Sequence, residues 1–131
     1  MKRSKNSHPT YEPKISTARY VFRKNGYNDG DLTFDQWYEL SQQNCYYCGR
    51  CPSTKANRFI DCPSHRDAAS EYAKKYGTFI YNGVDRINNM EHHIDECVPC
   101  CQTCNMAKGT MPIKAFKAWI IKVYEHFASK K

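Results

Sequence analysis

Two pairs of cysteines have the spacing of a metal site. Cys45 and Cys48 are separated by two residues, and so are Cys101 and Cys104. Two intervening residues allow both thiolates of a pair to bind one tetrahedral ion, and two such pairs complete its four positions. Because the protein supplies all four ligands, such a site keeps no open position for a substrate. We therefore predict a structural Zn²⁺ that joins two segments distant in the sequence.

The chain has eight cysteines, and their spacing leaves four without a role: Cys51, Cys62, Cys97 and Cys100. Cys100 is adjacent to Cys101, but the two-residue spacing favours Cys101 as the ligand. Cys51 and Cys62, together with His65, offer the ligands of a second zinc site. The alternative is that the four remaining cysteines are small buried residues or free thiols.

Four short motifs follow one another along the chain: Cys-Tyr-Tyr-Cys-Gly at 45–49, Asn-Gly-Val-Asp-Arg-Ile at 82–87, Val-Pro-Cys-Cys at 98–101 and Cys-Asn-x-x-Lys-Gly at 104–109. Their order and spacing resemble the HNH endonucleases, and among these the small virus- and phage-type enzymes with Asp-Arg in place of Asp-His. The resemblance covers roughly residues 30–118. It implies an α+β fold with a ββα-metal core, held together by a four-cysteine structural zinc and flanked by helices.

The resemblance also implies roles for single residues. It assigns a catalytic divalent cation, Mg²⁺ or Mn²⁺, to Asp85 and Asn105. Such a cation neutralises a phosphodiester and stabilises the leaving oxygen. Arg86 occupies the position of the family's general-base histidine, where it can hold a phosphate but cannot deprotonate water near neutral pH. The alternative for Asp85 is a carboxylate that caps the turn after Asn82-Gly83.

The general base is therefore an open question in the sequence: another group activates the water, or the metal and bulk hydroxide suffice, or the protein is catalytically weak. His92 and His93 follow in the next loop, and an unperturbed imidazole titrates near pH 6.5. The alternative for both is that they are ordinary loop histidines. Glu96 falls where the family has its middle asparagine, and it would brace the backbone there or add a carboxylate near the metal.

The charge of the chain is uneven. Its 131 residues include 20 Lys and Arg against 13 Asp and Glu, a net charge of +7. Residues 1–26 and 105–131 hold 13 of the basic groups and only two acidic ones, so the segment between them is net acidic. Basic ends suit the phosphate backbone of DNA. We assign backbone contacts to Lys108, Lys114 and Lys117, and the alternative is that these lysines are solvated helix residues.

These features predict an endonuclease that nicks or cleaves DNA phosphodiester bonds. The alternative is a non-catalytic, zinc-stabilised module that binds nucleic acid and does not need Asp85 or Asn105. No stretch approaches 18 apolar residues, and residues 1–6 lead into polar sequence. We therefore expect an intracellular protein without a membrane span, secretion signal or secreted partner.

Capping and turn signals predict the elements that position these residues. We expect a basic arm over 1–13 and a single domain over 14–131, with its core at about 44–110. Helices are predicted over residues 16–24, 34–43, 65–76 and 112–128, with a helical turn at 105–109. Thr33 and Gln36 fit a capping box at the second helix. The apolar stripe of the last helix is expected to be buried.

Two strands are expected around the Asn82-Gly83 dipeptide. Residues 78–81 are β-branched and aromatic, and 84–87 form the return strand of the predicted hairpin. Residues 45–62 and 88–96 are expected to be loops.

Overall fold

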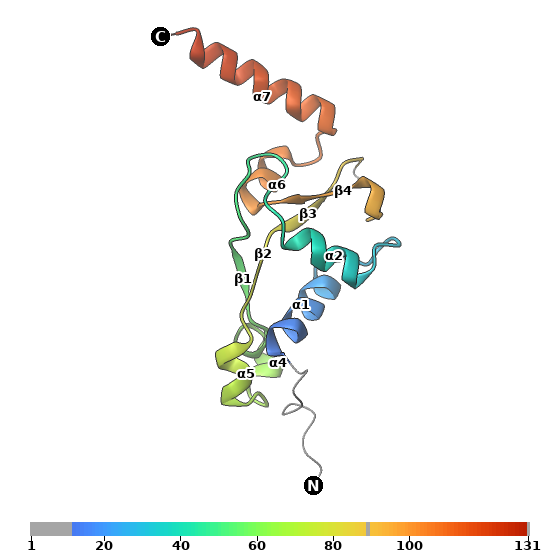
Figure 1. Cartoon of the computed structure of the whole chain (residues 1–131), viewed down its shortest axis with the longest axis vertical. Coiled ribbons are helices and arrows are strands. Elements are labelled where there is room, and N and C mark those ends of the chain that lie inside the picture. The colour runs from blue at the N-terminus through green and yellow to red at the C-terminus, as the bar shows by residue number, and fades with distance from the viewer. Residues whose placement is uncertain (1–11, 89, 131) are drawn as a thin grey trace.

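The computed structural model describes residues 12–88 and 90–130 and has a mixed α/β fold with two small antiparallel sheets (Figure 1). The helices are α1 (Pro13–Lys24), α2 (Phe34–Ser41), α3 (Arg58–Asp61), α4 (Pro63–Arg66), α5 (Glu71–Tyr76), α6 (Gln102–Lys108), α7 (Ile113–Ala128) and the 3₁₀ helix η2 (Ile94–Glu96). The strands are β1 (Thr54–Ala56), β2 (Phe79–Tyr81), β3 (Gly83–Arg86) and β4 (Cys97–Cys100). Of the predicted arm, residues 1–11 lie outside the described part of the chain, and Pro13 already begins α1.

The core is built around Trp37 of α2, which is completely buried. Its indole ring contacts aromatic rings from α1, from β2 and from its own helix, including Phe22 at 5.5 Å and Phe79 at 5.9 Å between centroids. The capping box of α2 is confirmed: Gln36 donates its backbone N–H to the Thr33 hydroxyl, and Thr33 donates to the Gln36 side chain. The cap and the buried indole therefore position α2 as its sequence predicts, although the helix ends at Ser41.

The predicted hairpin around Asn82-Gly83 is wrong. β2 pairs with β1 and β3 pairs with β4, so the two strands that flank this dipeptide belong to different sheets. Asn82 is completely buried, and its amide donates to the carbonyls of Gln43 at 2.9 Å and Arg50 at 3.1 Å. Gly83 is not among the described glycines with positive φ, which a tight hairpin turn of the expected type requires. The hairpin of this region is instead β3 and β4, joined by residues 87–96 and followed by α6.

Two further predictions in the first half of the chain are wrong. Residues 45–62 contain β1 and α3 rather than a continuous loop. The single helix predicted over 65–76 is two short helices, α4 and α5, with four residues between them. Ser70 caps the second of these helices, because its hydroxyl accepts the N–H of Ala73 at 3.1 Å and starts a new helix there.

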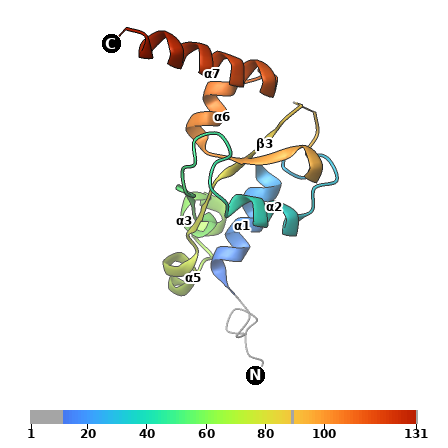
Figure 2. The same ribbon diagram turned by 45° about the horizontal axis from the view of Figure 1, so that its top comes forward.

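The last helix, α7, has nearly the predicted length, but its apolar stripe is not buried. Among its described residues only Phe116 is buried, whereas Trp119, Tyr124 and Phe127 are 47%, 70% and 64% exposed. Both views show α7 projecting beyond α6, away from the core (Figures 1 and 2). The prediction fails because periodicity marks an apolar face without showing what covers it.

No helix among the described residues is long and apolar enough to cross a membrane.

A candidate metal centre and the adjoining pocket

The four cysteines predicted as ligands converge on one point. The Sγ atoms of Cys45, Cys48, Cys101 and Cys104 all lie within 4.8 Å of one another. Tetrahedral zinc with Zn–S bonds of about 2.3 Å separates its sulfurs by about 3.8 Å. Cys48 Sγ and Cys101 Sγ are 3.7 Å apart. The chain therefore carries a four-cysteine group that can hold a metal ion such as zinc.

Local backbone structure preorganises this group. Gly49 has a φ of +80° and donates its N–H to the carbonyl of Cys45 at 2.9 Å, which closes the turn of the first pair. Cys101 is the N-cap of α6, and its Sγ accepts the N–H of Cys104 at 3.4 Å. The N–H of Tyr46 donates to the carbonyl of Pro99 at 2.8 Å, so the two halves are already connected by backbone.

The same backbone sets the protonation of the thiols. Burial raises the pKa of Cys45, but hydrogen bonds from the N–H groups of Cys101, Cys48 and Tyr47 outweigh it and bring the pKa to about 6. Burial and the neighbouring thiols raise the pKa of Cys104. The group therefore contains a thiolate near neutral pH and further thiols whose protons a bound cation would displace.

The other four cysteines fall into two kinds. Cys97 and Cys100 are buried on β4, where burial raises the pKa of Cys97 to about 11 and also raises that of Cys100. Both are therefore uncharged thiols of the core. Cys51 is exposed and Cys62 is half-buried. Neither forms a second metal group with His65, because the described part of the chain holds no other cluster of three or more such ligands.

A pocket of about 250 Å³ lies between β3 and the C-terminal end of α6. Its walls include Asp85 and Arg86 from β3, His92 from the following loop and Asn105 from α6. Asn105 directly follows the Cys104 ligand, so the four-cysteine group anchors the helix that carries it. The structure thus brings together at one pocket the two residues assigned to the cation, the arginine and one of the two histidines.

Asp85 is buried, and both of its carboxylate oxygens have partners. The Tyr47 hydroxyl donates to Oδ2 at 2.7 Å, while Lys108 Nζ lies 3.2 Å from Oδ2 and 3.4 Å from Oδ1. Burial and the Asp85 carboxylate raise the pKa of Tyr47, so its hydroxyl remains a donor. The arrangement differs from the predicted exposed phosphate contact at Lys108, because α6 turns this side chain inward, where it is completely buried.

No protein-family profile matches this chain, and no solved structure matches it either. A protein of Acanthamoeba polyphaga mimivirus, described only as uncharacterized, is 32% identical to it over 97 residues. This similarity covers 73% of the chain but 14% of the viral protein. The chain therefore resembles a small part of a longer viral protein.

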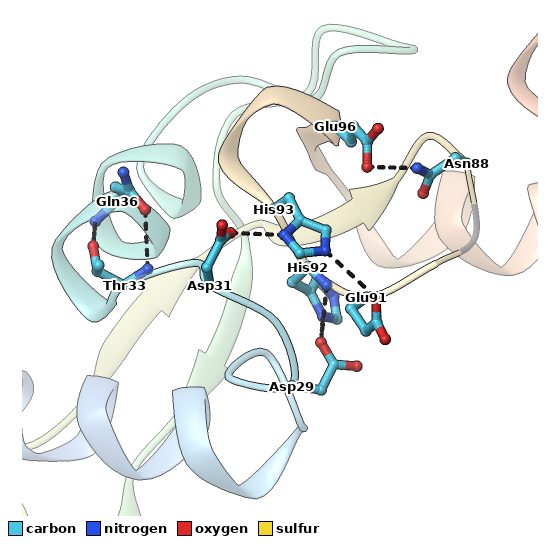
Figure 3. A network of polar contacts seen from close by, with 9 residues as sticks. All are labelled: Asp29, Asp31, Thr33, Gln36, Asn88, Glu91, His92, His93 and Glu96. Atoms are coloured by element: carbon cyan, nitrogen blue, oxygen red, sulfur yellow. Dashed lines mark hydrogen bonds and ion pairs between the residues drawn. The ribbon is translucent and has the colours of Figure 1, made fainter.

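The other two residues predicted for the site, His93 and Glu96, are not among the residues that line this pocket, and their contacts lie within the polar network of Figure 3. His93 Nδ1 is 2.7 Å from a carboxylate oxygen of Asp31, a contact that raises the pKa of His93. Glu96 accepts a hydrogen bond from the Asn88 side chain, and its carbonyl accepts the N–H of Ile87 at 2.8 Å. The contacts of Glu96 are those of the loop-bracing role, one of the two roles considered for it.

Sequence reasoning missed two residues of this site. Tyr47 lies inside the first cysteine pair, and this position was a usable signal that it would come near the metal ligands. Asp29 lies 63 residues before His92, yet its Oδ1 is 2.8 Å from His92 Nδ1. Nothing local to residue 29 indicates this contact.

The two remaining predicted residues, Lys114 and Lys117, are exposed on α7, where Lys117 donates to the Tyr46 hydroxyl at 2.6 Å.

Proposed function

We propose that this chain is a DNA endonuclease of the HNH type that hydrolyses phosphodiester bonds with the help of Mg²⁺ or Mn²⁺. The observation that supports this best is the single pocket shared by Asp85, Arg86 and Asn105. The chain order adds support, because an antiparallel hairpin, β3–β4, is followed at once by α6. In the proposed enzyme these three elements form the ββα-metal core, and zinc on the four cysteines holds the helix against the hairpin.

The oxygen donors of the pocket fit a hard cation. The Asp85 carboxylate and the Asn105 amide are the ligand types that Mg²⁺ prefers, and waters commonly complete its coordination shell. A bound cation would supply charge neutralisation at the phosphate and at the leaving oxygen. Arg86, half-buried at the pocket wall, would hold a non-bridging phosphate oxygen with its fixed fork of donors. Tyr47 orients the Asp85 carboxylate by donating to it.

The ion pair between Lys108 and Asp85 favours a second candidate function. Its ammonium already supplies a positive charge 3.2 Å from the carboxylate that would bind the cation. A chain that uses Asp85 structurally would be a non-catalytic zinc module that binds nucleic acid. In the nuclease, by contrast, the cation must share or displace this ammonium.

Plasmid nicking separates the two candidates. We expect wild-type protein with Mg²⁺ or Mn²⁺ to convert supercoiled plasmid to open circles, and Asp85→Asn to lower the rate at least about 100-fold, since a metal ion contributes several kcal/mol to such a step. Asp95→Asn, an exposed carboxylate on η2, is the matched control and should nick at the wild-type rate. Background-level nicking by both wild type and Asp85→Asn would favour the non-catalytic module.

The salt dependence of DNA binding tests the role of α7. Each phosphate contact contributes about −0.9 to the slope of log K against log salt concentration. Replacing both Lys114 and Lys117 by glutamine should therefore make the slope shallower by about 2, measured by fluorescence anisotropy on a labelled duplex. Lys75→Gln on α5, which lies at the opposite end of the molecule from α7, is the control (Figure 1). An unchanged slope in the double variant would remove α7 from the DNA interface.

A further inference from the structure

The proposed nuclease, on which this inference rests, needs a proton acceptor that residue 86 cannot supply. A guanidinium keeps its proton at neutral pH, so Arg86 cannot activate water. Of the histidines in the described part of the chain, His92 is the one that lines the pocket with Asp85 and Asn105. Its imidazole therefore borders the cavity in which the proposed cation and phosphate would lie, as a general base must.

His92 is held in place through its main chain and its ring. Oδ1 of Asp29 accepts the backbone N–H of His92 at 2.9 Å and lies 2.8 Å from ring Nδ1. The N–H of Leu32 donates to the His92 carbonyl at 3.1 Å. The ring of Tyr27 packs at 71° to the imidazole, with 5.2 Å between centroids. A Cβ at Gly30 would collide with the His92 carbonyl, so residues 29–32 form a close-fitting clamp.

The Asp29 carboxylate determines which nitrogen of the neutral His92 ring carries the proton. Burial raises the pKa of Asp29, but hydrogen bonds from the main chain and ring of His92 lower it overall, so its carboxylate is ionised at neutral pH. An ionised carboxylate only accepts hydrogen bonds, so in the neutral imidazole Nδ1 carries the hydrogen and Nε2 carries the lone pair. Among the described residues, Nε2 of His92 has no hydrogen-bond partner. It is also not one of the side-chain atoms that are fully buried without a partner. It therefore remains open to a water molecule.

His93, the adjacent histidine, has no ring nitrogen without a partner and does not line the pocket. Figure 3 shows the contacts of its ring. Its two ring nitrogens face carboxylates, with Nδ1 at 2.7 Å from Asp31 and Nε2 at 3.5 Å from Glu91. It is also absent from the walls of the pocket that holds His92. The two histidines, equivalent candidates in the sequence, are therefore distinct in the structure.

We propose that His92 is the general base of the nuclease and that Asp29 is the residue that positions it. Nε2 takes a proton from the attacking water as the water oxygen forms its bond to phosphorus. The bond from phosphorus to the leaving sugar oxygen breaks, and that oxygen takes a proton from solvent. His92 then returns its proton to solvent. Asp29, whose side chain is 42% exposed, holds the ring in one tautomer and pairs with the imidazolium during the step.

The first test compares His92→Ala with His93→Ala in the metal-dependent nicking assay. A positioned base contributes about 10²–10⁴ in rate. We expect His92→Ala to lose at least about 100-fold and to regain part of the rate when free imidazole is added, because imidazole can occupy the vacated space. His93→Ala should stay within about twofold of wild type and gain nothing from imidazole. Circular dichroism of both variants verifies the fold.

The second test reads the role of Asp29 from the tautomer of His92 as well as from activity. In wild type at mildly alkaline pH, ¹⁵N chemical shifts of the His92 ring should show one neutral tautomer, with the hydrogen on Nδ1. In Asp29→Ala the shifts should move toward the tautomer mixture of a free imidazole, and nicking should fall about tenfold or more. Asp29→Glu, which keeps the carboxylate, should retain more of the wild-type tautomer and rate than Asp29→Ala.

The outcomes separate this inference from the proposed function. Absence of nicking by wild type would overturn both. Nicking that depends on Asp85 but is unchanged in His92→Ala would overturn the role of His92 and leave the nuclease standing. An unchanged tautomer in Asp29→Ala would overturn the positioning role of Asp29.

Discussion

Replacing Cys104 by serine should release the metal ion and leave the chain largely unfolded at 25 °C. The four-cysteine group joins two segments that are 53 residues apart at Cys48 and Cys101. Structural zinc contributes about 10–16 kcal/mol of binding free energy in small zinc domains, whereas a whole domain is stable by only about 5–15 kcal/mol. Native mass spectrometry should show one bound Zn²⁺ in wild type and none in Cys104→Ser.

Cys51→Ser is the matched control for this prediction. Cys51 is an exposed cysteine outside the four-cysteine group, so this variant should keep one Zn²⁺ and change the free energy of unfolding by less than about 0.5 kcal/mol. A chelator should unfold wild type and Cys51→Ser alike in thermal scans. Stoichiometric zinc retained by Cys104→Ser would contradict the assignment of these ligands.

Replacing Lys108 by methionine should destabilise the fold by about 3–5 kcal/mol, because it leaves the Asp85 carboxylate buried without its cation. Removing both charges, in Asp85→Asn with Lys108→Met, should recover much of this loss, since neither a buried ammonium nor a buried carboxylate remains. Urea denaturation of wild type, the two single variants and the double variant measures this thermodynamic cycle. Strictly additive effects would show that the two groups are not coupled.

The same variant examines the proposed cation site. A divalent cation that binds Asp85 competes with the Lys108 ammonium in wild type but meets an unpaired carboxylate in Lys108→Met. Mn²⁺ should therefore stabilise Lys108→Met more than wild type, and it should not stabilise the double variant. Lys114→Met, an exposed lysine of α7, controls for the loss of a charge elsewhere and should respond as wild type does.

The exposed face of α7 bears on how a DNA duplex would approach the protein. Tyr46 connects the helix to the first cysteine pair through the hydrogen bond from Lys117, and the ring of Phe116 lies 5.2 Å from that of Tyr47. The hydroxyl of Tyr47 in turn contacts Asp85. In the proposed nuclease, the basic helix, the zinc centre and the cation site are therefore joined by two consecutive tyrosines.

Local chemistry along the chain was enough to predict several features of this protein. The two-residue spacing of Cys45–Cys48 and Cys101–Cys104 predicted the four-cysteine group, because ligands so close in sequence can meet one ion with little help from the rest of the fold. The Thr33–Gln36 capping box and the length of α7 were predictable for the same reason. Each depends on hydrogen bonds or propensities within a few residues.

Tertiary structure decided what depends on distant partners. Burial of Asn82, whose Nδ2 donates to the carbonyls of Gln43 and Arg50, replaced a locally favoured turn by a connection between two sheets. Lys108 turned inward because a buried carboxylate lies across from it. His92 and His93 each meet a carboxylate about 60 residues earlier, but of the two only His92 lines the pocket with Asp85, because the fold turns its ring to that side. In each case the conformation depends on a contact with a partner distant in sequence, which no local pattern predicts. The sequence therefore indicated the chemistry, and tertiary packing determined which residues are positioned for it.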